Sequence, residues 1–357
     1  MERLKVAVLG AGGLVAQRLQ QRLSNHPWFE LAAVAGSPRF QDLALGDVPW
    51  ALDEQRPELP ALKVLDVSSA DTVSDLVENG VVMAFSSLPR EQAAQLEPLW
   101  VKGGITVFSN ASAFRAVDGV PLVIPEVNPA ALDDGGKGLN HACATNCTLL
   151  PLILPLAALH ETYGLQQFTM RSEQGLSGGG HAYMLTALQT GDVSPEIPGE
   201  AEKTEAEFRH ILGWQGEASL TCQRVMRADG HHVFVEATFE RPVNVENIRK
   251  ALESWSKNHT MAELPSGPKQ PLAVVDRIQP AAHLFADGKG FPVKPDLAND
   301  LAAGMAVVVG NFRCPSSTTV CFEAYSHNTV RGAAGGVVFL AELAHWKGLV
   351  STKPVHP

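Results

Sequence analysis

Cysteine is scarce in this sequence. Only 5 occur among 357 residues, at positions 143, 147, 222, 314 and 321, and no two have the C-x-x-C spacing of a zinc site. So small and uneven a set does not suit a disulfide framework. We therefore expect reduced thiols, a cytoplasmic location and no bound metal.

Positive charge is also low. Lys and Arg number 28 against 38 Asp and Glu, which gives a net charge of −10. Because an acidic protein repels a phosphate backbone, we do not expect nucleic acid as a partner. A small anionic ligand can still meet a local cluster of Arg and Lys.

Long hydrophobic runs are missing as well. The longest apolar stretch, 149–159, is far shorter than the roughly 20 residues that cross a bilayer, and it contains two prolines. The first residues, MERLKVAVLGAGG, lack the hydrophobic block and cleavage site of an export signal. The sequence predicts no membrane association, and 149–159 is interpreted as the start of a buried helix.

The composition is that of a globular protein, with 45% apolar and 18% charged residues. A length of 357 residues suits about two domains of roughly 100 to 200 residues each. Up to about residue 140, short apolar runs alternate with helical stretches such as 14–23 and 90–102, which predicts a doubly wound parallel sheet. The expected strands are 4–9, 31–34, 62–67, 81–86, 105–109 and 122–124.

The pattern changes beyond a polar, glycine-rich stretch at 133–138. In 231–239, Val233 and Val235 share one face while Glu236 and Glu240 share the other. This alternation predicts an antiparallel sheet with one face open to solvent. The expected strands here are 220–225, 231–239, 305–309 and 320–324, and the expected helices are 199–210, 244–257 and 332–346.

A glycine-rich turn follows the first strand. Gly10, Gly13 and Ala16 form G-x-x-G-x-x-A where a helix begins, and the free N–H groups of a helix start can bind a pyrophosphate. The turn therefore predicts a dinucleotide site. The residues expected there are Gly10, Gly12, Gly13, Leu14 and Val15.

The end of the second strand indicates which dinucleotide binds. An NAD site usually has an Asp or Glu there for the ribose hydroxyls, whereas this sequence reads VAGSPRF, with Ser37 and Arg39 and no acid. NADP is therefore the expected cofactor. The alternative is that Ser37 and Arg39 are loop residues only.

Cys147 lies in ATNCTLLPLILPL, where polar residues give way to an apolar helical run. The positive end of a helix dipole lowers the pKa of a nearby thiol, which predicts a reactive thiolate. The alternative for a lone cysteine is an inert core residue. The other four cysteines lack this setting.

Two arginines and two histidines flank the turn 228–230. Arg224 and Arg227 precede it, and His231 and His232 follow it. Such a turn can present a carboxylate clamp and a proton carrier to one pocket. His231 has the parity of the apolar face, so a hydrogen-bonded core histidine is the alternative.

Together these segments resemble the aspartate-semialdehyde dehydrogenase family, and specifically its archaeal and fungal branch. The resemblance covers nearly the whole chain and rests on the number and order of the motifs. They are GAGGLVAQ, HPWFEL, SNASAFR, PLVIPEVNP, TNC, QGLSGGG, GEAEKTEAEFRHILG, RVMRADGHH and SHNTVRGAAGG.

The resemblance implies an α/β fold of two domains. One is a Rossmann-type domain with a doubly wound parallel sheet, which also receives the C-terminal helix. The other is an α+β substrate domain with a mostly antiparallel sheet, which makes the dimer interface. The corresponding division is 1–140 with 328–357 for the first and 141–327 for the second, in a homodimer or homotetramer.

The resemblance also implies roles for individual residues. Cys147 resembles the nucleophile, His231 the acid/base, and Gln174 the residue that orients the substrate. Arg224 resembles the arginine that holds the substrate carboxylate. The groups that bind phosphate and order that part of the pocket are Arg115, Lys203 and Glu200, and those that hold nicotinamide are Ser177, Gly178 and Asn328.

The implied activity is the NADPH-dependent reductive dephosphorylation of L-aspartyl 4-phosphate to L-aspartate 4-semialdehyde, and its reverse, through a cysteine thioester. This reaction belongs to the biosynthesis of Lys, Thr and Met. The expected partners are an acyl phosphate or aldehyde substrate and phosphate.

Several positions depart from the family pattern. The sequence ATNC replaces N-P-N-C, Met226 replaces a proline, and the glycine-rich turn has Gly12 for Thr and Ala16 for Gly. Pocket walls decide which acyl group fits, so these departures leave alternatives open. They are a reductase of another activated acyl group, such as a malonyl-CoA-like thioester or acetylglutamyl phosphate, and a non-catalytic NADP-binding paralogue.

Overall fold

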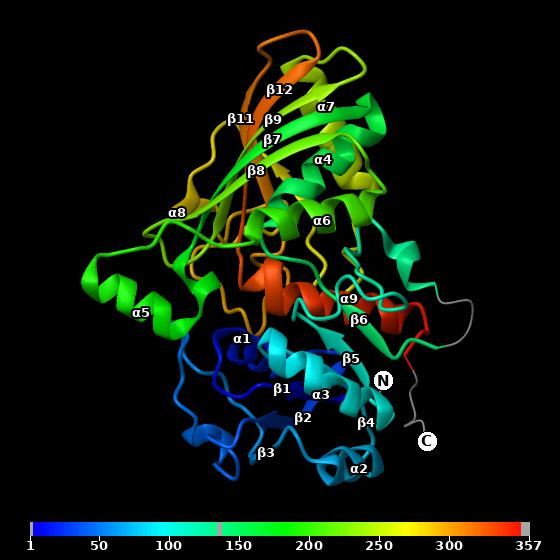
Figure 1. Ribbon diagram of the computed structural model, residues 1–357, viewed down its shortest axis with the longest axis vertical. Helices are drawn as coiled ribbons and strands as arrows, with labels where there is room; N and C mark the ends of the chain where they lie inside the picture. Colours follow the sequence, from blue (N-terminus) through cyan, green and yellow to red (C-terminus); the bar gives the residue numbers. More distant parts are fainter. Residues whose placement is uncertain (1–2, 134–137, 351–357) are drawn as a thin grey trace.

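The computed structural model describes residues 3–133 and 138–350. The chain forms two lobes, each built on a six-stranded sheet, and they are stacked along the long axis of the molecule (Figure 1). The strand orders are β3-β2-β1-β4-β5-β6 and β10-β11-β12-β9-β7-β8.

The first sheet is entirely parallel, which confirms the doubly wound fold predicted from the alternating runs. Its strands are β1 (Leu4–Leu9), β2 (Phe29–Gly36), β3 (Val64–Asp66), β4 (Val81–Ser86), β5 (Thr106–Ser109) and β6 (His141–Cys143). Helices α2 (Ala70–Glu78) and α3 (Arg90–Lys102) cover one face, whereas α1 (Leu14–Leu23) and α9 (Gly335–Trp346) cover the other. The first lobe also holds two short 3₁₀ turns, Leu45–Asp47 and Pro129–Leu132.

The expected strand at 122–124 is wrong. Leu122 makes only an isolated bridge to Cys143, and β6 is the sixth strand instead. Pro121 and Pro125 flank the segment and lack N–H groups, so it cannot form a continuous ladder. The border that we expected between residues 140 and 141 therefore lies directly before the last strand of the first sheet.

The C-terminal helix α9 is buried on nearly every side. Val337, Val338, Phe339 and Leu340 belong to the same core cluster as strands β1, β4 and β5. Figure 1 shows α9 lying between the two sheets, far in sequence from the strands that it covers. The first lobe is thus completed by the last described segment of the chain.

The second sheet mixes parallel and antiparallel pairs. Its strands are β7 (Leu165–Gln174), β8 (Glu217–Arg224), β9 (His231–Phe239), β10 (Leu272–Val274), β11 (Val307–Arg313) and β12 (Thr319–Ser326). The pairs β11–β12, β12–β9 and β9–β7 are antiparallel, while β10–β11 and β7–β8 are parallel. The mostly antiparallel arrangement confirms the expected fold class.

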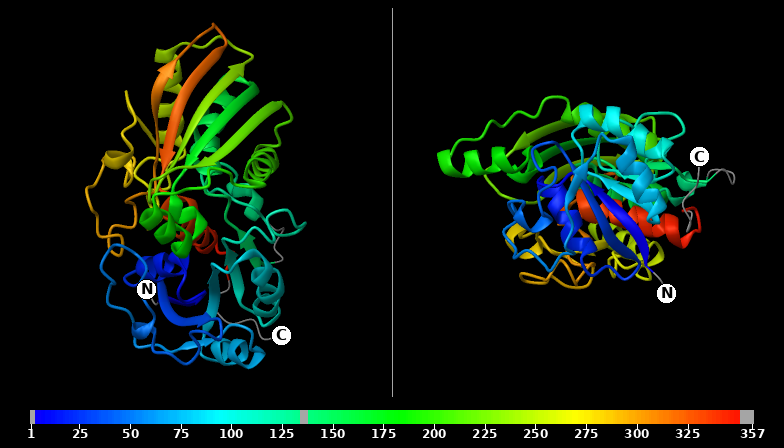
Figure 2. Two further views of the ribbon diagram at one scale, coloured as in Figure 1. Left: turned by 60° about the vertical axis from the view of Figure 1, so that its left-hand side comes forward. Right: turned by 90° about the horizontal axis from the view of Figure 1, so that it is seen from below.

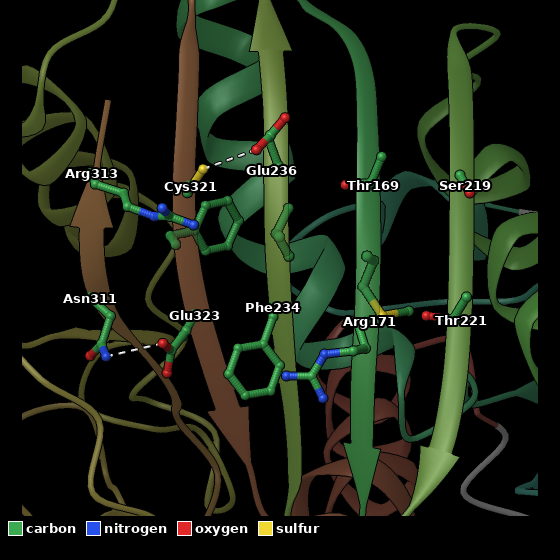
Figure 3. Close-up of a pocket in the computed structure, with 13 residues that line it drawn as sticks. Thr169, Arg171, Ser219, Thr221, Phe234, Glu236, Asn311, Arg313, Cys321 and Glu323 are labelled. Carbon is green, nitrogen blue, oxygen red and sulfur yellow. Dashed lines mark hydrogen bonds between the residues drawn. The ribbon is translucent and has the colours of Figure 1, made fainter. Parts of the chain in front are cut away.

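Three helices cover one face of this second sheet, as Figure 2 shows from a second direction. They are α4 (Leu149–Tyr163), α6 (Glu200–Leu212) and α7 (Val245–Asn258). On the other face, the segment 278–286 covers Val308 and Tyr325 at one end of the sheet. The rest of this face is open, and polar side chains such as Arg171, Glu236 and Arg313 stand on it (Figure 3).

The π-helix Val330–Ala334 joins β12 to α9, while α8 (Pro280–His283) packs beside β12. Helix α5 (His181–Thr190) and the 3₁₀ turn Leu176–Gly179 follow β7 and pack against Leu14 and Leu52 of the first lobe.

None of the helices within residues 3–133 and 138–350 is long and apolar enough to cross a membrane.

Candidate active site

The ends of three neighbouring strands bring together residues that the sequence singled out. Gln174, the last residue of β7, pairs with Arg224 of β8 and with His231 of β9. Directly paired residues of a sheet point to the same face. The register therefore sets Arg224, Gln174 and His231 in one row, on the face that the helices cover.

Cys147 meets this row from the loop between β6 and α4. The Asn146 side chain accepts a 2.6 Å hydrogen bond from the N–H of Thr148, which fixes the turn that leads into the helix. The Sγ atom of Cys147 then lies 3.2 Å from Nε2 of His231. A nucleophile and a proton carrier thus come within hydrogen-bond reach, as thiol chemistry requires.

The expected lowering of the Cys147 pKa is wrong for the protein without ligands. Burial, together with the negative charge of Glu200, raises the pKa of this thiol to about 12, while Arg115 opposes both effects. The helix start was visible in the sequence, but these charges come from other segments. Cys147 therefore rests as a neutral thiol.

His231 is also neutral at rest. Burial lowers the pKa of its imidazole to about 3; the nearby Gly230 carbonyl opposes this effect, and the positive charge of Arg224 adds to it. The N–H of Gly175 donates to Nδ1 at 3.2 Å. Because Nδ1 has both a donor and an acceptor beside it, the ring can carry its proton on either nitrogen.

Arg224 lies beside the imidazole of His231. Its Nη1 donates to the carbonyl of Gly175 at 2.9 Å, and its guanidinium lies 5.2 Å from the centre of the Tyr183 ring. A Cβ at Gly178 would lie 3.2 Å from Nη1 of Arg224 and 3.4 Å from the His231 ring. Only a glycine leaves the space in front of both groups open.

The arginine expected to bind phosphate contacts the nucleophile loop through a carboxylate. Arg115 donates to Glu207 at 2.8 Å and to the carbonyl of Asn110 at 2.6 Å. Glu207 in turn accepts from the N–H of Asn146 at 2.7 Å. Arg115 is therefore connected to the residue before Cys147 through a carboxylate.

Helix α6 contributes a second carboxylate to the same loop. Glu200, its first residue, accepts from Nδ2 of Asn146 and from the hydroxyl of Thr148, both at 3.0 Å. Lys203 is exposed one turn later, with its ammonium group close to Gly199. The structure brings Glu200 to the nucleophile loop and leaves Lys203 at its solvent side.

The glycine-rich turn has the shape that a dinucleotide needs. Gly10 has φ +110°, and a Cβ there would lie 2.7 Å from Oγ of Ser87. Gly13 is the N-cap of α1, and a Cβ added to it would meet no described atom within 4 Å, so the helix start faces open space. Among the residues that the structure describes, no side chain caps α1 and no acid occupies its first turn, so its N–H groups are available to an anion.

Ser37 and Arg39 lie on the same side of the turn. Both are exposed just after β2, and the Arg39 guanidinium lies 5.1 Å from the centre of the Phe40 ring. That ring covers Gly12, where a Cβ would come within 2.6 Å of it. A flexible cation beside a pyrophosphate turn suits the extra phosphate of NADP.

Ser177 and Asn328 belong to one hydrogen-bond network. Asn328 accepts from the N–H of Gly230 at 2.7 Å and donates to Oγ of Ser177 at 2.8 Å. Ser177 in turn donates to Asp229 at 2.7 Å. This network ties the start of the π-helix to the turn that carries His231.

A cleft of about 1280 Å³ opens beside this network. Its walls include Leu14 at the start of α1, Ser177, and Asp229. The volume and position suit the part of a dinucleotide that reaches from the glycine-rich turn toward the reacting groups.

Sequence reasoning missed four residues of the site. Asn146, Glu207 and Asp229 supply the hydrogen bonds described above, and a Cβ at Gly332 would lie 2.5 Å from Cβ of Cys147. One signal was available, because Glu200, Thr204 and Glu207 recur at helical spacing and so share a face. The contact of Gly332 with Cys147 had no local signal.

Known proteins resemble this chain along nearly its whole length. Residues 5–135 match the family model described as semialdehyde dehydrogenase, NAD binding domain. The aspartate-semialdehyde dehydrogenase of Archaeoglobus fulgidus is 34% identical, over 96% of this chain and 98% of its own length. The malonyl CoA reductase (NADP) of Metallosphaera sedula is 28% identical, over 98% of this chain and 99% of its own length.

A solved structure extends the likeness to the whole fold. The crystal structure of aspartate-semialdehyde dehydrogenase with NADP from Candida albicans superimposes with a TM-score of 0.80 at 29% identity, and the match covers 98% of this chain and 100% of that one. This chain belongs to the aspartate-semialdehyde dehydrogenase family.

Proposed function

We propose that this chain catalyses the NADPH-dependent reductive dephosphorylation of L-aspartyl 4-phosphate to L-aspartate 4-semialdehyde, and its reverse, through a thioester on Cys147. The 3.2 Å contact between Sγ of Cys147 and Nε2 of His231 carries the proposal. Membership of the family and the likeness to a solved NADP complex support it.

Cys147 and His231 begin the oxidative direction as a neutral pair. As Sγ adds to the aldehyde carbon, Nε2 takes the thiol proton and returns it to the carbonyl oxygen, which gives a hemithioacetal on Cys147. When bound, NADP supplies the two-electron acceptor that converts this carbon to the thioester level. His231 takes the hydroxyl proton of the hemithioacetal in that step.

Phosphate then attacks the thioester carbonyl. The new P–O–C bond forms as the C–S bond breaks, and Cys147 leaves as the thiolate, which takes back its proton from His231. In the biosynthetic direction the same residues act in reverse order. Both directions therefore need one sulfur, one proton carrier and two anion-binding positions.

The anion-binding positions are provided by basic side chains around the row. Arg224 holds the substrate carboxylate beside His231, and Gln174 orients the substrate between them. Arg115 and Lys203 bind phosphate, and Glu200 orders the loop of Cys147 through Asn146 and Thr148. Local cations explain how a protein with a net charge of −10 accepts two anions.

The residues around the glycine-rich turn fit NADP. Gly10, Gly12, Gly13, Leu14 and Val15 would hold the pyrophosphate at the open start of α1, and Ser37 and Arg39 the additional phosphate. Ser177, Gly178 and Asn328 would hold the nicotinamide end near Cys147.

The test is phosphate-dependent reduction of NADP by L-aspartate 4-semialdehyde, followed by mass spectrometry of the quenched enzyme. We expect turnover that requires phosphate and an acyl adduct on the peptide that contains Cys147. Product formation without that adduct, or equal turnover in Cys147→Ser, would show that the nucleophile is wrong. No turnover with any acyl substrate would favour a non-catalytic NADP-binding role.

A second candidate is reduction of a CoA thioester such as malonyl-CoA. The observation in its favour is the 28% identity to a malonyl CoA reductase (NADP) over nearly the whole length. The same thioester chemistry would apply, with CoA in place of phosphate. Oxidation of NADPH by malonyl-CoA but not by aspartyl phosphate would select this candidate.

We also propose that the two sheets define the functional division of the chain. The first domain holds the cofactor and extends through β6, with residues from 328 onward, and the second carries catalysis. The open face of the second sheet, with Arg171, Phe234 and Arg313, pairs two copies in a dimer or tetramer (Figure 3). Light scattering of wild type and Arg313→Glu tests this, since the variant should be smaller in solution.

A further inference from the structure

A buried ion pair joins two segments that enclose the nucleophile loop. Nη2 of Arg331 lies 2.7 Å from Oε2 of Glu126, and both residues are only 1% exposed. Removing two charges from water is costly, so a pair in this position is weak evidence for stability alone. Its neighbours indicate another role.

On one side, Arg331 belongs to the π-helix Val330–Ala334. The N–H groups of Gly332 and Ala334 bond to the carbonyls of His327 and Thr329, five residues back, each at 3.1 Å. Such turns are rare and occur frequently at functional sites. Here the turn presses Gly332 against the backbone of Cys147, so closely that a Cβ would lie 2.9 Å from its Cα.

On the other side, Glu126 follows a segment attached to β6. The N–H of Val123 donates to the carbonyl of Cys143 at 3.1 Å, and the N–H of Cys143 donates to the carbonyl of Pro121 at 2.8 Å. The loop that carries Cys147 starts directly after Cys143. Glu126 therefore lies on the segment that fixes where this loop begins.

The loop fits closely between the two segments. The space left between Ala144, Thr145, Arg331 and Gly332 amounts to about 10 Å³, roughly the minimum for one water molecule. A shift of the π-helix away from Glu126 would therefore let the backbone of Cys147 move with it.

We propose that Arg331 and Glu126 are positioning residues for the nucleophile: their ion pair holds the π-helix against Cys147 and so keeps Sγ within reach of His231. This inference rests on the proposed function, but it concerns the geometry of the thiol, which can be measured without turnover. Neither side chain needs to touch substrate or cofactor.

The first test is the alkylation rate of Cys147 by iodoacetamide, followed by mass spectrometry of the peptide that contains it. We expect Glu126→Gln and Arg331→Met to slow this reaction about 10-fold or more, because loss of the His231 contact removes the hydrogen bond that Nε2–H can donate to the thiolate, which is the species that alkylates. A folded Glu126→Gln protein with the wild-type alkylation rate would overturn the proposal.

The second test separates positioning from general destabilisation. In a His231→Asn background, Glu126→Gln should cause little further loss of alkylation rate, because the contact that it supports is already absent. If Glu126→Gln reduces the alkylation rate by the same factor in the His231→Asn background as in wild type, the proposal is overturned. Should the single variants fail to fold, Glu126→Leu with Arg331→Met removes both charges together and should still alkylate slowly.

A matched control exists in α9. Glu342 is fully buried, pairs with His26 at 2.9 Å and accepts from the N–H of Ser266 at 2.8 Å. Glu342→Gln should lower the melting temperature and leave the alkylation rate of Cys147 unchanged. If turnover with aspartate semialdehyde is absent in wild type while alkylation follows this pattern, the proposed function fails and the positioning role stands.

Discussion

The sulfur of Cys147 lies 3.2 Å from Nε2 of His231, although 84 positions separate the two residues in the chain. One residue comes from the start of a helix and the other from the start of a strand in the second sheet. Burial keeps both groups neutral by raising the pKa of the thiol and lowering the pKa of the imidazole.

His231→Asn should lower kcat about 100-fold or more while NADP affinity is kept, because the variant loses the proton carrier and leaves the glycine-rich turn intact. Steady-state kinetics and cofactor titration measure both quantities. The control is His232→Asn, since His232 points to the opposite face of β9. Weak NADP binding with normal turnover would contradict the assigned role.

Alkylation of Cys147 in the ligand-free protein should accelerate about tenfold per pH unit between pH 7 and 9, without a plateau. The reason is that the thiol pKa of about 12 keeps the thiolate a minor species throughout this range. Pseudo-first-order rates at several pH values measure this directly.

Glu200→Gln supplies the control for that profile. Removing the charge that raises the thiol pKa should speed alkylation at pH 8 about 3- to 10-fold, while the amide keeps the shape of the side chain. A wild-type rate that levels off near pH 7 would instead indicate a thiolate paired with a charged imidazole.

Arg39→Ala should weaken NADP binding about 10-fold or more and affect NAD much less, because only NADP carries the extra phosphate. Arg39 is exposed, so the variant should keep its fold. Calorimetric titration with each nucleotide gives the comparison. Equal losses for both nucleotides would remove the basis for assigning the phosphate to Arg39.

Stability should decline as the pH falls from about 6.5 toward 4. Burial lowers the pKa of His231 to about 3 and of His232 to about 4, so the unfolded chain takes up protons first. Each such histidine contributes stability that is complete above its unfolded pKa of about 6.5, and that declines by about 1.4 kcal/mol per pH unit below it. Urea unfolding at pH 7, 6 and 5 measures the slope.

His232→Asn should make the decline of the unfolding free energy with falling pH shallower, because one of the two titrating histidines is removed. An unchanged slope in the variant, or a flat profile in wild type, would show that these rings are charged in the folded protein.

Local patterns were enough to predict much of the fold. The helices 14–23 and 90–102 and the strand 231–239 begin and end where the structure has them, because apolar spacing, glycine turns and strand parity all agree there. The strand at 122–124 failed because its flanking prolines outweigh its apolar residues. Strand β7 was not separately predicted, yet its last residue, Gln174, sets the row of the site.

The sequence indicates the two residues that form the 3.2 Å contact but not the electrostatics around them. The family motifs point to Cys147 and His231, and the start of α4 is visible in the sequence. The charge of Glu200, more than 50 positions away, reaches the thiol only through tertiary packing. Long-range burial and charge therefore reversed the pKa direction that the helix start suggested.

The place of α9 in the first lobe has a consequence for biogenesis. A ribosome must release residues up to about Trp346 before β1, β4 and β5 gain the apolar cover that Val337 to Leu340 provide. Until then the nascent chain exposes the apolar face of an incomplete sheet, which favours chaperone binding or misassembly. Truncation before Val337 should therefore leave the core of the first lobe incomplete, although nearly all of both sheets has been made.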